Sequence, residues 1–250
     1  MIDIKSNLLQ INEKIRNAEA KSSRKENSVK LMAVSKFHPI EEIQQAIDCG
    51  QLLFGENKVQ EASQKFPKLF QNNQNIELQM IGVMQSNKVK NAVKIASCIQ
   101  SVDRIDLLNE IEKQCAKIEK NINILFEIHT GEETKSGFEC FEDVQMALNL
   151  FSENKFPHIT PKGFMTMAPF TEDKSLIHKS FETVYNLSQK LQQQFPSFDL
   201  SELSMGMSGD FEIAIEHGST LVRVDSAKMG EQILNNNVKI KILAIDFFIF

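Results

Sequence analysis

Short apolar runs alternate with longer amphipathic segments along most of the chain. Most of the short runs are rich in Val, Ile, Leu, Phe or Met and are bounded by Gly, Asn, Ser or Asp, as buried β-strands are. They predict eight strands, at 30–35, 52–55, 78–83, 99–102, 122–129, 162–166, 202–205 and 220–224.

The segments between the strands carry an apolar residue every three or four positions, which predicts helices. One such segment begins at Pro39, a residue suited to a first helical turn, and has Ile40, Ile43 and Ile47 on one face. The same period predicts helices at 39–48, 87–97, 106–121, 142–154, 174–195 and 209–218.

Strands that alternate with helices make βα units, which favour parallel strands joined by right-handed crossovers. Eight such units in 250 residues match the size of a (β/α)8 barrel. An open doubly wound sheet is the alternative, but no GxGxxG or Walker sequence follows any strand. We therefore expect an α/β fold, a single (β/α)8 TIM barrel over residues 1–232, followed by a C-terminal tail at 233–250.

Composition and charge exclude several classes of protein. The net charge is −5 and there is no Trp, so neither the charge nor the stacking surface for a nucleic-acid partner is expected. The four cysteines form no CxxC pair and the five histidines show no metal spacing, so we expect no metal and read the histidines as surface or core residues. Reduced thiols, an N-terminus unlike a signal peptide and the lack of a long apolar run predict a cytoplasmic protein without a membrane partner.

The last twelve residues, KIKILAIDFFIF, are strongly apolar and follow three asparagines. They are too few to span a bilayer. A closing strand, a packed tail and an exposed adhesive end all stay open, and we attach no function to this segment.

Polar or glycine residues follow every predicted strand. In a barrel of this kind, the carboxyl ends of the strands meet on one rim, where binding and catalytic groups gather. These residues include Lys36, Glu56, Asn57, Gln85, Ser86, Asn87, Lys88, Asp103, Arg104, Ser204, Gly206, Ser208, Gly209, Arg223, Asp225 and Ser226. One polar strand end means little, whereas eight that share a rim favour a binding site.

The strand ends suggest a particular ligand. A lysine amine in a partly desolvated pocket can form a Schiff base with a carbonyl, and Lys36 is the candidate. Small Ser and Gly residues lead into the short helix at 209–218, where an anion would be favoured, and Ser226 adds a hydroxyl. Together with a ring contact from Arg223, these groups suggest pyridoxal 5′-phosphate.

The sequence also resembles the pyridoxal phosphate homeostasis proteins, the YggS/PROSC family, whose barrel is similar to the N-terminal domain of alanine racemase. The resemblance covers roughly residues 28–232. It is carried, in the family's order, by AVSKFHP, FGENKVQE, IGVMQSNK, SVDR, KSGF, LSMGMSGDFEIAIEHGST and VRVDSAKMGE. Any one of these stretches alone would be weak, but together they are highly specific.

The resemblance implies roles for individual residues. Lys36 would form the Schiff base with the cofactor. Ser208 and Ser226 would hold its phosphate, and Arg223 would face the pyridine nitrogen.

Asn57 and Met205 would line the same pocket, again as the resemblance implies. Asp225 and Ser226 stand where the family usually has Gly-Thr, and a carboxylate beside a phosphate is repulsive unless it points away. If Asp225 contributes only its backbone N–H, the site survives with weaker affinity. The strand-three loop, GVMQSNK in place of the family's common GHLQSNK, is a milder departure.

Three functions stay in view. The resemblance implies a carrier that binds pyridoxal 5′-phosphate and passes it to apo pyridoxal enzymes, and we expect it to act as a monomer. A pyridoxal-dependent amino-acid racemase is the main alternative, and a Schiff-base aldolase without a cofactor is the third. Alanine racemases take a second base, a tyrosine, from a further domain for which this chain has no room; its one tyrosine, Tyr185, lies in a predicted helix. We therefore expect a binding protein without established catalytic activity.

Each candidate residue also has a plain structural interpretation. Lys36 could be a surface lysine whose stem covers apolar surface, and Arg223 could pair with a carboxylate at the edge of the core. Asn57 could cap the following helix, and the Ser/Gly segment 204–209 could be an ordinary turn. The positions of the side chains decide between these interpretations.

Overall fold

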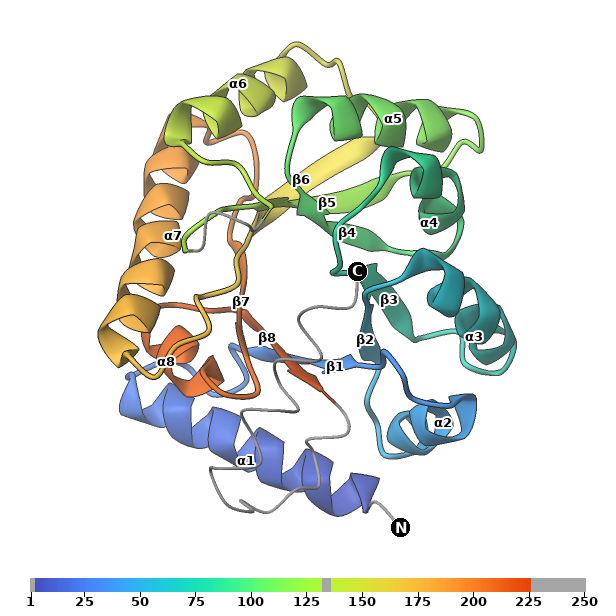
Figure 1. Cartoon of the computed structure of the whole chain (residues 1–250), viewed down its shortest axis with the longest axis vertical. Helices are drawn as coiled ribbons and strands as arrows, with labels where there is room; N and C mark the ends of the chain where they lie inside the picture. Colours follow the sequence, from blue (N-terminus) through green and yellow to red (C-terminus); the bar gives the residue numbers. More distant parts are fainter. Residues whose placement is uncertain (1–2, 132–135, 226–250) are drawn as a thin grey trace.

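The computed structural model describes residues 3–131 and 136–225 of the chain. Eight parallel strands form a closed barrel in chain order, and the helices surround it (Figure 1). The strands are β1 (Lys30–Val34), β2 (Leu53–Glu56), β3 (Glu77–Met80), β4 (Cys98–Val102), β5 (Ile122–Glu127), β6 (Ile159–Met165), β7 (Glu202–Met207) and β8 (Leu221–Asp225). The expected (β/α)8 TIM barrel is confirmed.

The helices lie outside the strands, where their apolar faces pack on the barrel. They are α1 (Ile4–Lys21), α2 (Ile40–Asp48), α3 (Val59–Asn72), α4 (Val89–Ile95), α5 (Ile105–Ala116), α6 (Phe141–Ser152), α7 (Lys174–Gln194) and α8 (Phe211–Glu216), with a short 3-10 helix, η1 (Ser86–Lys88). α1 precedes the first strand and packs against α8 and α2, so it closes the ring of helices beside β8 and β1 (Figure 1). Among the described residues, no helix combines the length and apolar character that crossing a membrane requires.

The predicted set of helices lacks α1, before the first strand, and α3, between β2 and β3. The absence of α3 has a local cause. Pro67 lies inside this helix and removes one backbone hydrogen bond, which weakens the helical signal in the sequence. Its buried residues, Val59, Ala62, Phe66 and Leu69, nevertheless pack into the hydrophobic core. Tertiary packing therefore keeps this helix continuous across the proline.

Strand β3 ends at Met80, although the apolar pattern extends it to residue 83. The chain beyond it passes very close to the backbone that follows β2. A Cβ at Gly82 would lie 2.4 Å from the carbonyl oxygen of Asn57, so a side chain there would clash. The prediction was too long because this close approach draws the chain out of the sheet.

The predicted tail at 233–250 lies outside the described residues, and so does Ser226. The last described residue, Asp225, stands at the carboxyl end of β8. Because β8 pairs with β1, this end of the described chain lies beside the first strand on the rim.

Candidate functional site

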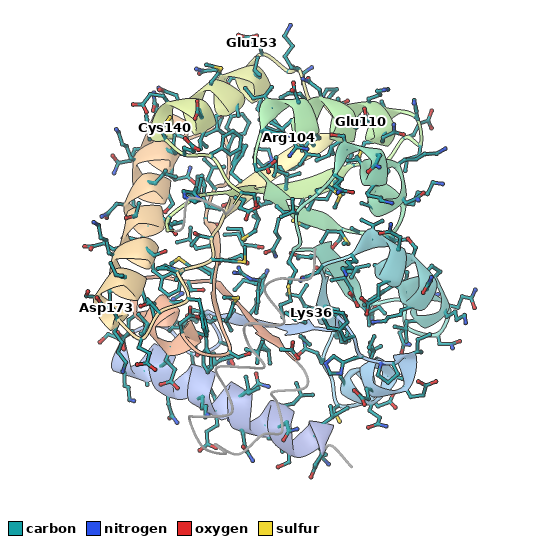
Figure 2. The ribbon with its side chains drawn as sticks, in the orientation of Figure 1. Lys36, Arg104, Glu110, Cys140, Glu153 and Asp173 are labelled. Carbon is teal, nitrogen blue, oxygen red and sulfur yellow. The ribbon has the colours of Figure 1, made fainter. Side chains whose placement is uncertain are left out.

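The strand register brings three predicted site residues to one sector of the rim. Val34 of β1 pairs with Gly55 of β2 and with Asp225 of β8. Lys36 lies two residues after Val34, and Asn57 lies two residues after Gly55, so both stand at the ends of neighbouring strands. Figure 2 shows Lys36 at the end of β1.

Lys36 lies in a turn whose neighbouring residues are held in place. The backbone N–H of Ser35 donates to the carbonyl of Gly55 at 3.0 Å. Phe37 adopts a φ of +65°, which is uncommon for a non-glycine residue, and its N–H donates to Glu61 Oε1 at 2.6 Å. The Lys36 side chain is half-buried, with Nζ 5.8 Å from the centre of the Phe37 ring. The backbone around Lys36 is thus fixed at the end of β1.

A charged cluster of Glu56, Glu61 and Lys65 lies beneath this turn. Lys65 Nζ donates to the carbonyl of Ser35 at 3.0 Å, to Glu56 Oε1 at 3.3 Å and to Glu61 Oε1 at 2.5 Å. The Ser35 hydroxyl donates to Glu56 Oε1 at 2.8 Å. Burial raises the pKa of Glu56, and the nearby Lys65 opposes that rise. The cluster ties the turn that carries Lys36 to β2 and α3.

The ends of β7 and β8 also meet. The N–H of Asp225 donates to Ser208 Oγ at 3.3 Å, so these two predicted site residues are adjacent. Gly206 has a φ of +96°, and a Cβ there would lie 2.8 Å from the Cα of Phe211, so glycine allows α8 to pack tightly on β7. α8 has six residues and begins after Asp210. Ser208 therefore lies in the loop before the helix and not in its first turn.

The Asp225 carboxylate points to a partner that the sequence did not reveal. Its Oδ1 lies 3.3 Å from His38 Nε2, and His38 Nδ1 lies 2.6 Å from Glu42 Oε2. The hydrogen bond that the His38 ring donates to Asp225, with a further one to Glu42, raises the pKa of His38 against the opposing effect of burial. The histidine pattern predicted no role for His38, whereas the structure places it between two carboxylates.

Arg223 lies inside the barrel and is 3% exposed. Its Nη1 donates to the carbonyl and the hydroxyl of Ser204, at 2.6 and 2.7 Å, and its Nη2 donates to the carbonyl of Thr166 at 2.8 Å. Burial lowers its pKa to about 10, so the guanidinium stays charged at neutral pH. The structure therefore provides a fixed positive charge within the barrel.

The remaining predicted residues are placed differently. Met205 is fully buried in the hydrophobic core, and Asn57 is half-buried after β2. The structure brings Lys36, Ser208 and Asp225 to adjoining strand ends, while Ser226 lies outside the described residues.

The residues that the motifs missed, Glu61 among them, stand inside quoted stretches such as FGENKVQE, but only their contacts reveal a role. Within the described ranges, no group of three or more His, Cys, Asp or Glu side chains could hold a metal ion.

Comparison with known proteins defines the class first. The family model "Alanine racemase, N-terminal domain" matches residues 6–231. The chain is 36% identical over 228 residues to the pyridoxal phosphate homeostasis protein of Pasteurella multocida, covering 91% of this chain and 97% of that protein. The protein of the same name from Escherichia coli is 33% identical over 236 residues, covering 92% and 97% of the two chains. The chain therefore belongs to the alanine racemase N-terminal domain family and, within it, to the pyridoxal phosphate homeostasis proteins, as the motifs indicated.

Solved structures agree with this assignment. PipY from Synechococcus elongatus, solved with pyridoxal phosphate bound, is 30% identical with a TM-score of 0.75, covering 86% of this chain and all of PipY. An alanine racemase from Clostridium difficile has a TM-score of 0.72 at 15% identity, covering 94% of this chain and 58% of that one. At that identity the racemase shares the barrel fold, and the likeness extends no further.

Proposed function

We propose that this protein binds pyridoxal 5′-phosphate reversibly, through a Schiff base on Lys36, and serves in the homeostasis of the cofactor. The observation that carries the proposal is the half-buried residue Lys36, on a turn held from both sides, at the strand end next to Asp225 and Ser208. The relatives that bear this functional name and the pyridoxal phosphate bound in PipY support it.

The residues of the rim fit this cofactor. When bound, pyridoxal 5′-phosphate supplies an aldehyde carbon that an amine can attack. Ser208 offers a hydroxyl to a phosphate, and Arg223 keeps a positive charge within the barrel, which suits a ring nitrogen that stays unprotonated. The Asp225 carboxylate beside Ser208 has the wrong sign for a phosphate, and its contact with His38 turns it toward a positive partner.

The same residues favour holding the cofactor over turning over a substrate. An unprotonated ring nitrogen makes the cofactor a poorer electron sink, so a racemase-like reaction gains little from Arg223. Tyr185 lies on α7 with its ring over Gly218, which precedes β8 and is therefore near the amino ends of the strands, opposite the rim. Reversible binding by a monomer in the cytoplasm would let apo pyridoxal enzymes take the cofactor from this protein.

The visible absorbance spectrum with added pyridoxal 5′-phosphate, before and after borohydride, tests the proposal. We expect a Schiff-base band in the wild type, an adduct located on Lys36 by mass spectrometry, and neither in Lys36→Ala. Lys58→Ala is the matched control, because Lys58 Nζ lies 6.0 Å from the same Phe37 ring. A band that survives in Lys36→Ala, or an adduct on another lysine, would overturn the assignment.

A further inference from the structure

Asp225 belongs to the cluster of groups where the phosphate would lie. Its N–H bonds Ser208 Oγ, and it ends the strand that pairs with β1. A carboxylate at this position repels an anion and would weaken its binding by itself. The chain must therefore either turn the carboxylate away or pair it with a positive group.

His38 provides that group. It follows Lys36 by two residues, it is 8% exposed, and its backbone N–H donates to the carbonyl of Ser35 at 3.2 Å, so the Lys36 turn fixes its position. The carboxylates that face the ring are Asp225 on β8 and Glu42 on α2. A neutral imidazole can donate one hydrogen bond, whereas the protonated ring donates from both nitrogens. Two carboxylates on opposite nitrogens therefore suit the protonated form.

We propose that His38 is a positioning residue for the phosphate end of the ligand site, because its protonated ring holds the Asp225 carboxylate and neutralises it beside Ser208. The identity of the ligand as pyridoxal 5′-phosphate rests on the proposed function. The pairing itself depends only on contacts within the chain.

The proposal predicts a loss of affinity that depends on the phosphate. Removing the positive ring leaves the Asp225 carboxylate facing the phosphate, whereas pyridoxal, which lacks the phosphate, has little to lose. His38→Gln should weaken binding of pyridoxal 5′-phosphate about tenfold and leave binding of pyridoxal nearly unchanged. His38→Lys, which keeps a positive charge, should retain most of the affinity.

A double-variant cycle with Asp225→Gly locates the effect. Asp225→Gly removes the carboxylate and should tighten retention of pyridoxal 5′-phosphate. Adding His38→Gln to Asp225→Gly should then weaken binding far less than His38→Gln does in the wild type. His158→Gln is the matched control, because His158 bonds Glu112 in the same manner but precedes β6, away from the rim. If His38→Gln lowers the affinity for both ligands equally, or lowers it equally with and without the Asp225 carboxylate, His38 has a purely structural role and the proposal is overturned.

The ligand-free protein separates this inference from the proposed function. The imidazole of His38, followed by NMR, should titrate above its ordinary value of 6.5 and shift downward in Asp225→Gly. Inorganic phosphate, used as the probe, should raise the titration midpoint further in the wild type. A midpoint indifferent to both Asp225→Gly and phosphate rejects the His38 proposal. A midpoint that responds to both, in a protein that forms no adduct with pyridoxal 5′-phosphate, rejects the cofactor and keeps the anion site.

Discussion

Two clusters of polar side chains lie beneath the rim, and they are built from different chemistry. The charged cluster under β1 and β2 joins a lysine to two glutamates. The hydroxyl cluster between β5, β6 and α7 joins Thr130, Thr166 and Ser180: Thr130 Oγ1 lies 2.9 Å from Thr166 Oγ1 and 2.5 Å from Ser180 Oγ, and Thr166 also donates to the carbonyl of Ile128 at 2.8 Å.

The difference matters because the two clusters respond differently to the loss of one member. A buried charge left without its partner is strongly destabilising, whereas a missing hydroxyl removes only neutral hydrogen bonds. The charged cluster also carries the turn of Lys36, while the hydroxyl cluster holds the opposite side of the barrel. Stability and cofactor binding should therefore be coupled in the charged cluster. In the hydroxyl cluster the hydroxyl groups should affect stability alone, because Arg223 is held by the backbone carbonyl of Thr166 and not by its side chain.

Lys65→Ala should have the largest effect. Lys65 is 12% exposed on its side chain and Glu56 is fully buried, so the change leaves a buried carboxylate without its cation. We expect the free energy of unfolding to fall by about 3 kcal/mol in urea titrations. Lys113→Ala, which removes an exposed pair with Glu110, should have no measurable effect. Equal losses in the two variants would contradict the buried character of the charged cluster.

Glu61→Ala comes next and affects binding as well as stability. It removes the acceptor of the Phe37 N–H, so the turn of Lys36 loses one of the hydrogen bonds that hold it. We expect a loss of about 1.5 kcal/mol in stability and weaker formation of the pyridoxal band. Glu61→Gln keeps an acceptor oxygen and should recover part of the band. If the Ala and Gln variants give identical spectra, Glu61 does not position Lys36.

Thr166→Val tests the hydroxyl cluster. The valine keeps the shape of the side chain but cannot bond Thr130 or the carbonyl of Ile128. Stability should fall by about 1 kcal/mol, while the affinity for pyridoxal 5′-phosphate stays as in the wild type. A marked loss of affinity would show that the two sides of the rim are coupled after all.

The smallest expected effect is a dependence of stability on pH that arises at His38, beside the turn of Lys36. The pKa of His38 is raised in the folded protein. Its contribution to the free energy of unfolding is therefore full below about pH 6.5 and is lost as the pH rises through the raised pKa. Burial of the ring, which opposes the rise in pKa, limits this contribution to about 0.5 kcal/mol. Wild-type stability should fall over this range relative to His38→Gln, and Thr166→Val should follow the wild-type slope. Parallel slopes in wild type and His38→Gln would disprove the contribution.

The apolar runs predicted every strand because a strand buried between the barrel interior and the helices must be apolar along its length. They failed at α3, where Pro67 interrupts the helical signal, and at the end of β3, where the approach of Gly82 to Asn57 is a tertiary event. The motifs likewise identified Lys36, Ser208 and Asp225, which adjoin in the structure, but they left Glu61 and His38 without roles.

The sequence alone therefore determined the barrel, the sector of the rim that holds Lys36 and the family, because periodicity and local motifs depend on residues that are close together in the chain. Only the tertiary structure decided how the charges are paired. His38 and Asp225 are 187 residues apart in the chain, and Phe37 and Glu61 are 24 apart. Such pairs depend on strand register and on the closure of β8 against β1, and no local sequence pattern predicts either of these.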